Sequence, residues 1–189
     1  MNRSASSATM PPRVQAGGWL FIRLVLGFEW LRAGWEKVGD PGWTSSSVGG
    51  AVAGFLQGAI ARSTEGPHPE VPHWYHNLIE DLFLPNADLL GWLVAYGELL
   101  VGLALIFGVL TRLSAFFGVT MNVAYLWSGA SSTNPPMLLL GLAIVLVGRR
   151  AGAYGVDGWL MPWVVQRAGD GPIKAARLAV GAAAALVAA

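Results

Sequence analysis

A single carboxylate, Glu98, lies near the middle of an otherwise apolar run from Leu89 to Leu110. At about 1.5 Å of rise per residue, a helix over this run is about 33 Å long, roughly the thickness of a bilayer hydrocarbon core. A carboxylate at that depth costs about 2.5 kcal/mol or more, so we expect Glu98 to face other helices and to have a partner. A buried carboxylate of this kind can hold and release a proton, which is the chemistry this position offers.

The first apolar segment, Gly17 to Val38, carries the ionisable groups that could pair with Glu98. Glu29, Arg32 and Glu36 are spaced i, i+3 and i+7, so they share one face of a helix. We expect this face to point into the protein and Arg32 to pair with Glu98. The same network also fits a purely structural role, in which it only fixes the register of the helices, and that alternative stays open.

The composition favours one small membrane domain. The chain has 189 residues, of which 54% are hydrophobic and only 12% are charged, with a mean hydropathy of +0.51. Such values leave no room for a separate soluble catalytic domain, and the net charge of +1 gives no support to a nucleic-acid partner.

The chain contains no cysteine, which excludes thiol relays, cysteine-ligated iron–sulfur clusters and covalently attached haem within it. The three histidines (His68, His73 and His76) all lie between the apolar segments, so a membrane-embedded haem has no histidine ligands. His73 and His76 are three residues apart but have no obvious third ligand, and we expect no metal site. If the chain handles electrons, it must use a diffusible carrier such as quinone, or a partner subunit.

Charge is distributed unevenly along the chain. Residues 39–88 have a charge balance of −5, with Arg62 as their one basic residue. The segments outside both this loop and the apolar runs have a balance of +6, from Arg3, Arg13, Arg112, Arg149, Arg150, Arg167, Lys174 and Arg177 against Asp157 and Asp170. The positive-inside rule then predicts a multi-pass protein of the cell membrane with both termini in the cytoplasm and residues 39–88 outside.

Four spans agree with this arrangement: 17–38, 89–110, 113–128 and 135–148. We therefore predict an all-α membrane protein, a four-transmembrane-helix bundle with a structured outer loop. The expected divisions are a flexible cytoplasmic tail over 1–16, a membrane domain over 17–165 with its outer loop at 39–88, and an Ala-rich C-terminal helix over 166–189.

The outer loop contains two segments with helical features. Ser47 to Ala61 holds Gly50, Gly54 and Gly58, a spacing that permits close helix packing, although a flexible loop fits the same composition. Val71 to Phe83 has apolar residues at i, i+3, i+4, i+7 and i+8, which predicts an amphipathic helix lying along the membrane surface. Pro85 is expected to end that helix.

Three stretches of the chain resemble the DoxX/DoxD family of small four-helix membrane proteins: RLVLGFEWLRAGWEKV (23–38), GELLVGLALIFGVLTRLSA (97–115) and NPPMLLLGLAIVLVGRRAGAYGVD (134–157). The loop piece HWYHNLIEDLFLPNADLLGWL is similar to the DoxD branch. The family includes the small subunit of a thiosulfate:quinone oxidoreductase, as well as membrane subunits linked to thiol and oxidative-stress protection. The resemblance implies a membrane subunit of a quinone-linked oxidoreductase, with electrons coming from thiosulfate or another reduced sulfur compound.

A quinone site needs an apolar cleft with aromatic walls, a few polar groups for the quinone oxygens and a route for protons. We expect Glu98 and Glu29 to act in proton transfer. The quinone or the sulfur substrate would be bound by Arg32, Lys37, Tyr96, Trp30, Asn122 and Tyr125. Lys37 also fits a simpler role at the outer headgroups. The rival interpretation of the whole chain is a non-catalytic membrane anchor or assembly subunit of a larger complex, contacting the bilayer and a partner subunit.

Overall fold

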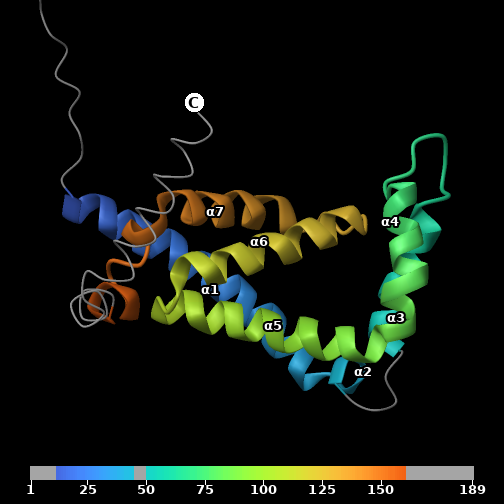
Figure 1. Cartoon of the computed structure of the whole chain (residues 1–189), viewed down its shortest axis with the longest axis horizontal. Coiled ribbons are helices and arrows are strands. Elements are labelled where there is room, and N and C mark those ends of the chain that lie inside the picture. Colours follow the sequence, from blue (N-terminus) through green and yellow to red (C-terminus); the bar gives the residue numbers. More distant parts are fainter. Residues whose placement is uncertain (1–11, 45–49, 161–189) are drawn as a thin grey trace, which may run out of the picture.

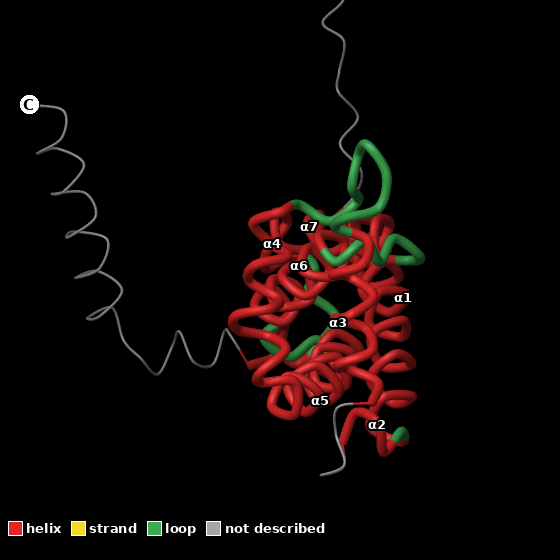
Figure 2. Tube along the Cα trace, turned by 90° about the vertical axis from the view of Figure 1, so that its right-hand side faces the viewer, coloured by secondary structure: helices red, strands yellow, loops and turns green. Residues whose placement is uncertain are grey.

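The computed structural model describes residues 12–44 and 50–160, and all regular structure within these ranges is helical (Figures 1 and 2). The all-α class is therefore confirmed. The long helices are α1 (Pro12–Gly39), α5 (Ala87–Phe107), α6 (Thr111–Trp127) and α7 (Asn134–Val147). The shorter ones are α2 (Pro41–Thr44), α3 (Gly50–Arg62), α4 (His73–Leu78), the π-helix η1 (Ile79–Phe83), and the 3₁₀ turns η2 (Leu84–Asn86) and η3 (Gly148–Arg150). α1 begins before residue 17, and the Ala-rich segment 166–189 lies outside the described residues.

The four long helices share one hydrophobic core. α1 packs along α5 and α6 packs along α7, while α5–α6 and α1–α7 contacts join the two pairs (Figure 1). Buried side chains from all four helices meet between them: Leu26, Trp30, Val101, Leu105, Ala115, Met137 and Ile144. The helices predicted from the apolar runs are therefore present, with bounds that differ from the prediction by only a few residues.

Glycine lets the backbones of α1 and α5 touch. A Cβ added at Gly34 would lie 2.3 Å from the backbone nitrogen of Leu99, and one at Gly102 would lie 2.3 Å from that of Leu31. Small residues that permit such close approach are typical of helix contacts in membranes. These two glycines therefore set the distance between the two helices.

The four long helices bury polar side chains and expose apolar ones, which is the reverse of the usual arrangement in a water-soluble protein. Arg23, Glu98 and Asn122 are buried, whereas large apolar side chains are exposed along α5, α6 and α7. Among the described residues one helical stretch, His73–Phe107, is long and apolar enough to cross a membrane. Figure 1 shows that this stretch turns sharply between α4 and α5. The number of spans predicted from the sequence remains a prediction.

A helical cap, made of α3 and α4, stands across one end of the long helices (Figure 1). α3 confirms that its segment is a helix and not a flexible loop. The predicted close packing at the glycines is not found, because a Cβ at Gly50 or Gly54 would meet nothing within 4 Å. α3 is instead packed through Val52, Leu56 and Ala59.

The amphipathic stripe of the second loop segment is borne out at its buried positions, Val71, Tyr75 and Ile79. Pro85, however, does not end the helical path. It lies inside η2, which leads directly into α5, because a proline is tolerated in the first turn of a helix, where its missing N–H has no partner to lose.

The opposite end is tied together by two buried or partly buried charges. The Arg23 guanidinium donates to two carbonyls of the loop 151–154, at 3.2 and 2.6 Å. The Asp157 carboxylate accepts from the backbone N–H groups of Leu110 and Thr111, both at 2.7 Å. Since these N–H groups begin α6, Asp157 satisfies donors that the helix itself leaves unpaired. No local sequence pattern predicts this contact, which joins segments far apart in the chain.

The glycine contacts lead to a stability prediction. Gly34→Ala or Gly102→Ala should force α1 and α5 apart and lower the free energy of unfolding by about 1–3 kcal/mol each, as overpacking does elsewhere. Gly54→Ala is the matched control: its new Cβ meets open space, and alanine favours a helix over glycine by about 1 kcal/mol. Unfolding in mixed detergent micelles measures all three variants, and equal stabilities of Gly34→Ala and Gly54→Ala would contradict the contact.

Candidate functional site

Polar side chains from two neighbouring helices contact Glu98, and we call Lys37, Glu98 and Tyr125 the Glu98 cluster. Lys37 Nζ lies 2.7 Å from Glu98 Oε2, and the Tyr125 hydroxyl donates to Glu98 Oε1. The Glu98 side chain is only 1% exposed, and that of Lys37 is 21% exposed. A carboxylate that has lost its water is thus compensated by one cation and one hydroxyl donor.

The close contact of α1 and α5 creates this cluster. Gly34 meets the backbone at Leu99, next to Glu98, and Lys37 follows Gly34 by one turn on the same face of α1. The long lysine side chain then spans the short remaining distance. The salt bridge therefore depends on the glycine that precedes it.

Aromatic rings surround the lysine and tyrosine of the cluster. Lys37 Nζ lies 5.2 Å from the ring centroid of Trp43 and 6.0 Å from that of Tyr125. Phe55 of the cap meets the Tyr125 ring edge-on, with centroids 6.0 Å apart. The Lys37 ammonium thus lies against aromatic rings, and the Phe55 contact places the cluster next to the cap.

Asn122 is a buried polar residue without a partner. It is 0% exposed, and neither its amide nitrogen nor its amide oxygen has a hydrogen-bond partner. It lies one turn from Tyr125 on α6, and a Cβ at Gly118, one turn further, would lie 3.0 Å from Trp30 Nε1. A buried polar atom without a partner costs about 1–3 kcal/mol, so Asn122 favours a bound polar group or a water molecule beside the cluster.

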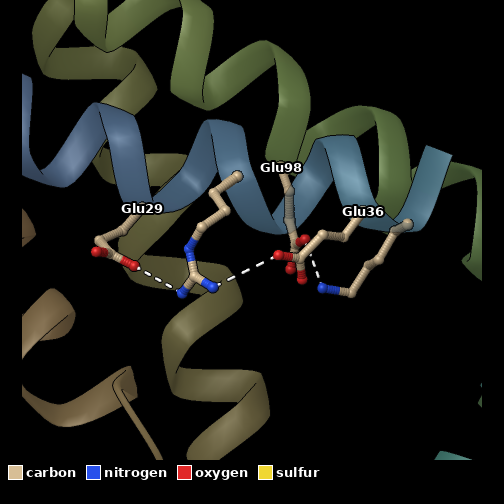
Figure 3. A network of polar contacts seen from close by, with 5 residues as sticks. Glu29, Glu36 and Glu98 are labelled. Atoms are coloured by element: carbon tan, nitrogen blue, oxygen red, sulfur yellow. Dashed lines mark hydrogen bonds and ion pairs between the residues drawn. The ribbon is translucent and has the colours of Figure 1, made fainter. Parts of the chain in front are cut away.

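Glu29 and Arg32, both expected at the site, do not lie there. Arg32 is 52% exposed and pairs along its own helix with Glu29 at 3.0 Å and Glu36 at 3.5 Å (Figure 3). The prediction that Arg32 pairs with Glu98 is therefore wrong, although the ion pair between Glu98 and this helix is confirmed. The partner is Lys37.

The spacing of other residues on α1 explains the error. Gly27, Trp30, Gly34 and Lys37 follow one another at three or four residues and form the packed face. Arg32 is two residues from both Trp30 and Gly34, so it points away from the core. The face that carries glycine and tryptophan is the buried side of α1. The charged residues had suggested that the opposite face of the helix was buried.

Two further predicted residues take different places. Trp30 is 2% exposed and lines the core near Gly118. Tyr96 is exposed and stacks on Trp92 at the outside of α5, with ring planes 5° apart. Tyr96 therefore does not contact the Glu98 cluster, since it lies two residues from Glu98 on another face of the helix.

The cap histidine His76 has protein partners at both ring nitrogens. Nδ1 lies 2.5 Å from the Ser63 hydroxyl, and Nε2 lies 3.2 Å from Glu80. The described residues contain no group of three or more side chains arranged to hold a metal ion. His76 is thus engaged in holding α4 to the end of α3.

The comparisons with known proteins give one match. The DoxX family model matches residues 18–130, a segment that contains Lys37, Glu98, Asn122 and Tyr125. No curated protein and no solved structure matches the chain.

The geometry makes a prediction about coupling. Lys37→Met leaves a buried carboxylate unpaired, and loss of one partner of such a pair typically costs about 3–5 kcal/mol. Lys37→Met and Glu98→Gln together should cost less than the sum of the single changes. The control is a second double-mutant cycle, which combines Arg32→Gln with Glu98→Gln. Its two changes should have additive effects on the free energy of unfolding. Coupling to Arg32 and none to Lys37 would refute the arrangement.

Proposed function

The chain belongs to the DoxX family of membrane proteins, and we propose that it acts as the membrane subunit of a quinone-linked oxidoreductase. The observation that carries this proposal is the buried carboxylate of Glu98, held between Lys37 and Tyr125. A quinone, when bound, takes up electrons and protons from its surroundings. A carboxylate that can hold and release a proton in a protected place meets the second of these needs.

The residues beside the cluster fit a quinone oxygen. The Asn122 amide offers an unpaired donor and an unpaired acceptor in the interior, and Trp30 provides an aromatic wall. Lys37 is more exposed than Glu98, so it can pass a proton between solvent and Glu98. Tyr125 fixes the orientation of the carboxylate through its hydroxyl. Glu98 and Lys37 thus handle the proton, while Asn122 positions the quinone.

The electron donor of our proposal is thiosulfate or another reduced sulfur compound, oxidised on a partner subunit. An anionic substrate at this chain would need a free cation near the outer side. Both candidates carry carboxylate partners, Lys37 at Glu98 and Arg32 at Glu29 and Glu36. An anion would have to displace a carboxylate, which favours the quinone side of the reaction for this chain.

We further propose that α1, α5, α6 and α7 all cross the cell membrane, with both chain termini in the cytoplasm. Supporting this, the exposed positions between the ends of α5, α6 and α7 carry no charged side chain, and Arg112, Arg149 and Arg150 gather at the end away from the cap. Basic residues at one end favour the cytoplasmic side for that end. The cap then lies outside.

The proposed proton role predicts a specific defect. Glu98→Gln keeps the shape and a hydrogen-bonding group but removes the group that titrates. Reduction of quinone by the assembled complex should fall by about 10²–10⁴-fold, the usual contribution of a positioned acid or base, while assembly and bound quinone remain. Arg32→Gln, outside the cluster, is the control and should retain quinone reduction.

Two results would overturn the proposal. Full turnover of Glu98→Gln with quinone still present would make the carboxylate structural. Absence of quinone from gently purified native protein, with activity of the complex independent of the cluster, would instead support the non-catalytic anchor.

The proposed topology can be tested by cysteine labelling, because the chain has no cysteine of its own to react. A cysteine introduced at the exposed residue Glu65, in the loop between α3 and α4, should react with a membrane-impermeant maleimide in intact cells. One introduced at the exposed residue Arg149 should react only after the cells are permeabilised. The reverse pattern, or labelling of both in intact cells, would contradict the proposed orientation.

A further inference from the structure

Lys37 lies in the last turn of α1, where a lysine side chain can turn either towards water or into the protein. The structure shows the inward direction, with the ammonium 2.7 Å from Glu98 and only 21% of the side chain exposed. A lysine side chain has a flexible four-carbon stem and loses rotamer entropy when it is held in one place. The group that covers the ammonium therefore helps to decide whether it stays at Glu98.

The indole of Trp43 covers the Lys37 ammonium. Lys37 Nζ lies over this ring, 5.2 Å from its centroid, and tryptophan is the side chain whose ring face attracts a cation most strongly. Tyr125 of α6 flanks the ammonium, with its ring centroid 6.0 Å from Nζ. Trp43 is itself half-buried and packs against the hydrophobic core of the cap. Its ring thus occupies space beside the ammonium that water would otherwise fill.

The position of Trp43 is set by backbone contacts of α2. Its N–H donates to the carbonyl of Asp40 at 3.0 Å, and the Asp40 carboxylate accepts from the N–H of Gly42 at 2.8 Å. On α5, Gly91 lies against the Trp43 carbonyl, since a Cβ added at Gly91 would be 2.6 Å from that oxygen. A glycine on α5 thus allows the backbone of α2 to come close enough for the indole to reach Lys37.

We propose that Trp43 is a positioning residue for the Glu98 cluster, whose ring face holds the Lys37 ammonium at Glu98 and away from water. Gly91 belongs to the same arrangement because it admits the Trp43 backbone. The role of Trp43 in turnover rests on the proposed function, in which Lys37 passes protons to Glu98. The contact itself depends on no substrate, so it can be tested separately.

Release of the lysine has unequal consequences for the two charges. An ammonium that leaves Glu98 gains water, whereas the Glu98 carboxylate is 1% exposed and cannot follow it. Glu98 would then keep the Tyr125 hydroxyl as its one remaining partner in the cluster. Trp43 therefore controls whether the proton carrier and the buried carboxylate remain in contact.

Acetylation by acetic anhydride tests the contact, because Lys37 and Lys174 are the two lysines of the chain. The reagent modifies a lysine amine that has left its partners and reached water. Trp43→Leu should raise the acetylation rate of Lys37, relative to that of Lys174, by about 2- to 30-fold, the range to which cation–π energies correspond. Gly91→Ala should raise it as well, because its Cβ displaces the Trp43 backbone. Mass spectrometry of the labelled peptides measures both rates in one sample.

The control variants show what the reagent detects. Glu98→Gln removes the charged partner and should release Lys37, so it is the positive control. Trp92→Leu replaces an exposed tryptophan on the outside of α5, and Gly54→Ala adds a Cβ in open space. Both should leave the acetylation rate of Lys37 unchanged.

Fluorinated tryptophans placed at position 43 separate the charge distribution of the ring from its size. Fluorine atoms withdraw electron density from the ring face and leave its shape nearly unchanged. Acetylation of Lys37 should rise stepwise with the number of fluorine atoms, and Trp43→Phe should lie between the native protein and Trp43→Leu. Equal protection of Lys37 across the fluorinated series, or in Trp43→Leu and the native protein, would overturn the proposal.

Quinone reduction by the assembled complex tests the positioning role. Trp43→Leu should lower kcat severalfold and leave the KM for quinone unchanged, and the fluorinated series should follow the order seen in acetylation. Full turnover in a variant that exposes Lys37 would overturn the role, as would lost turnover with Lys37 still protected. If the native complex reduces no quinone, the proposed function fails, and the acetylation rates alone decide whether Trp43 holds Lys37.

Discussion

The backbone contact between α1 and α5 is the constraint on which the rest of the structure depends. With Gly34 against Leu99 and Gly102 against Leu31, the two helices can adopt only one rotation relative to each other. That rotation turns Lys37 towards Glu98 and turns Arg32 away from the protein. The buried pair and the exposed charged row are thus two results of one steric arrangement.

Much of the helical framework could be predicted from the sequence because apolar runs and their polar breaks are local properties. α6 and α7 lie within a few residues of the predicted spans, and the stripe containing Tyr75 and Ile79 faces the core of the cap as its period indicated. Pro85 was misinterpreted for a related reason. Its effect depends on whether it stands inside a helix or at the start of the next one, and it stands at the start.

The site was harder to predict because it depends on rotation as well as on depth. The burial of Glu98 was predicted correctly, since a lone carboxylate in an apolar helix is costly to expose to lipid. Its partner on α1 had several candidates at similar depths, and only the packed face marked by Gly27, Trp30 and Gly34 separates Lys37 from Arg32. The contact of Asp157 with the start of α6 had no local signal at all.

The cap is mechanically connected to the Glu98 cluster at two points. One is a continuous helical path, in which α4 passes through η1 and η2 into α5, the helix that bears Glu98. The other is the Tyr75 hydroxyl, which donates to the carbonyl of Ala124 at 3.1 Å, one peptide bond before Tyr125. The cap is thus joined to the helix that bears Glu98 and to the backbone next to Tyr125. Because both connections lead to the hydrogen bond between Glu98 and Tyr125, a tilt of α4 would change the separation of these two side chains.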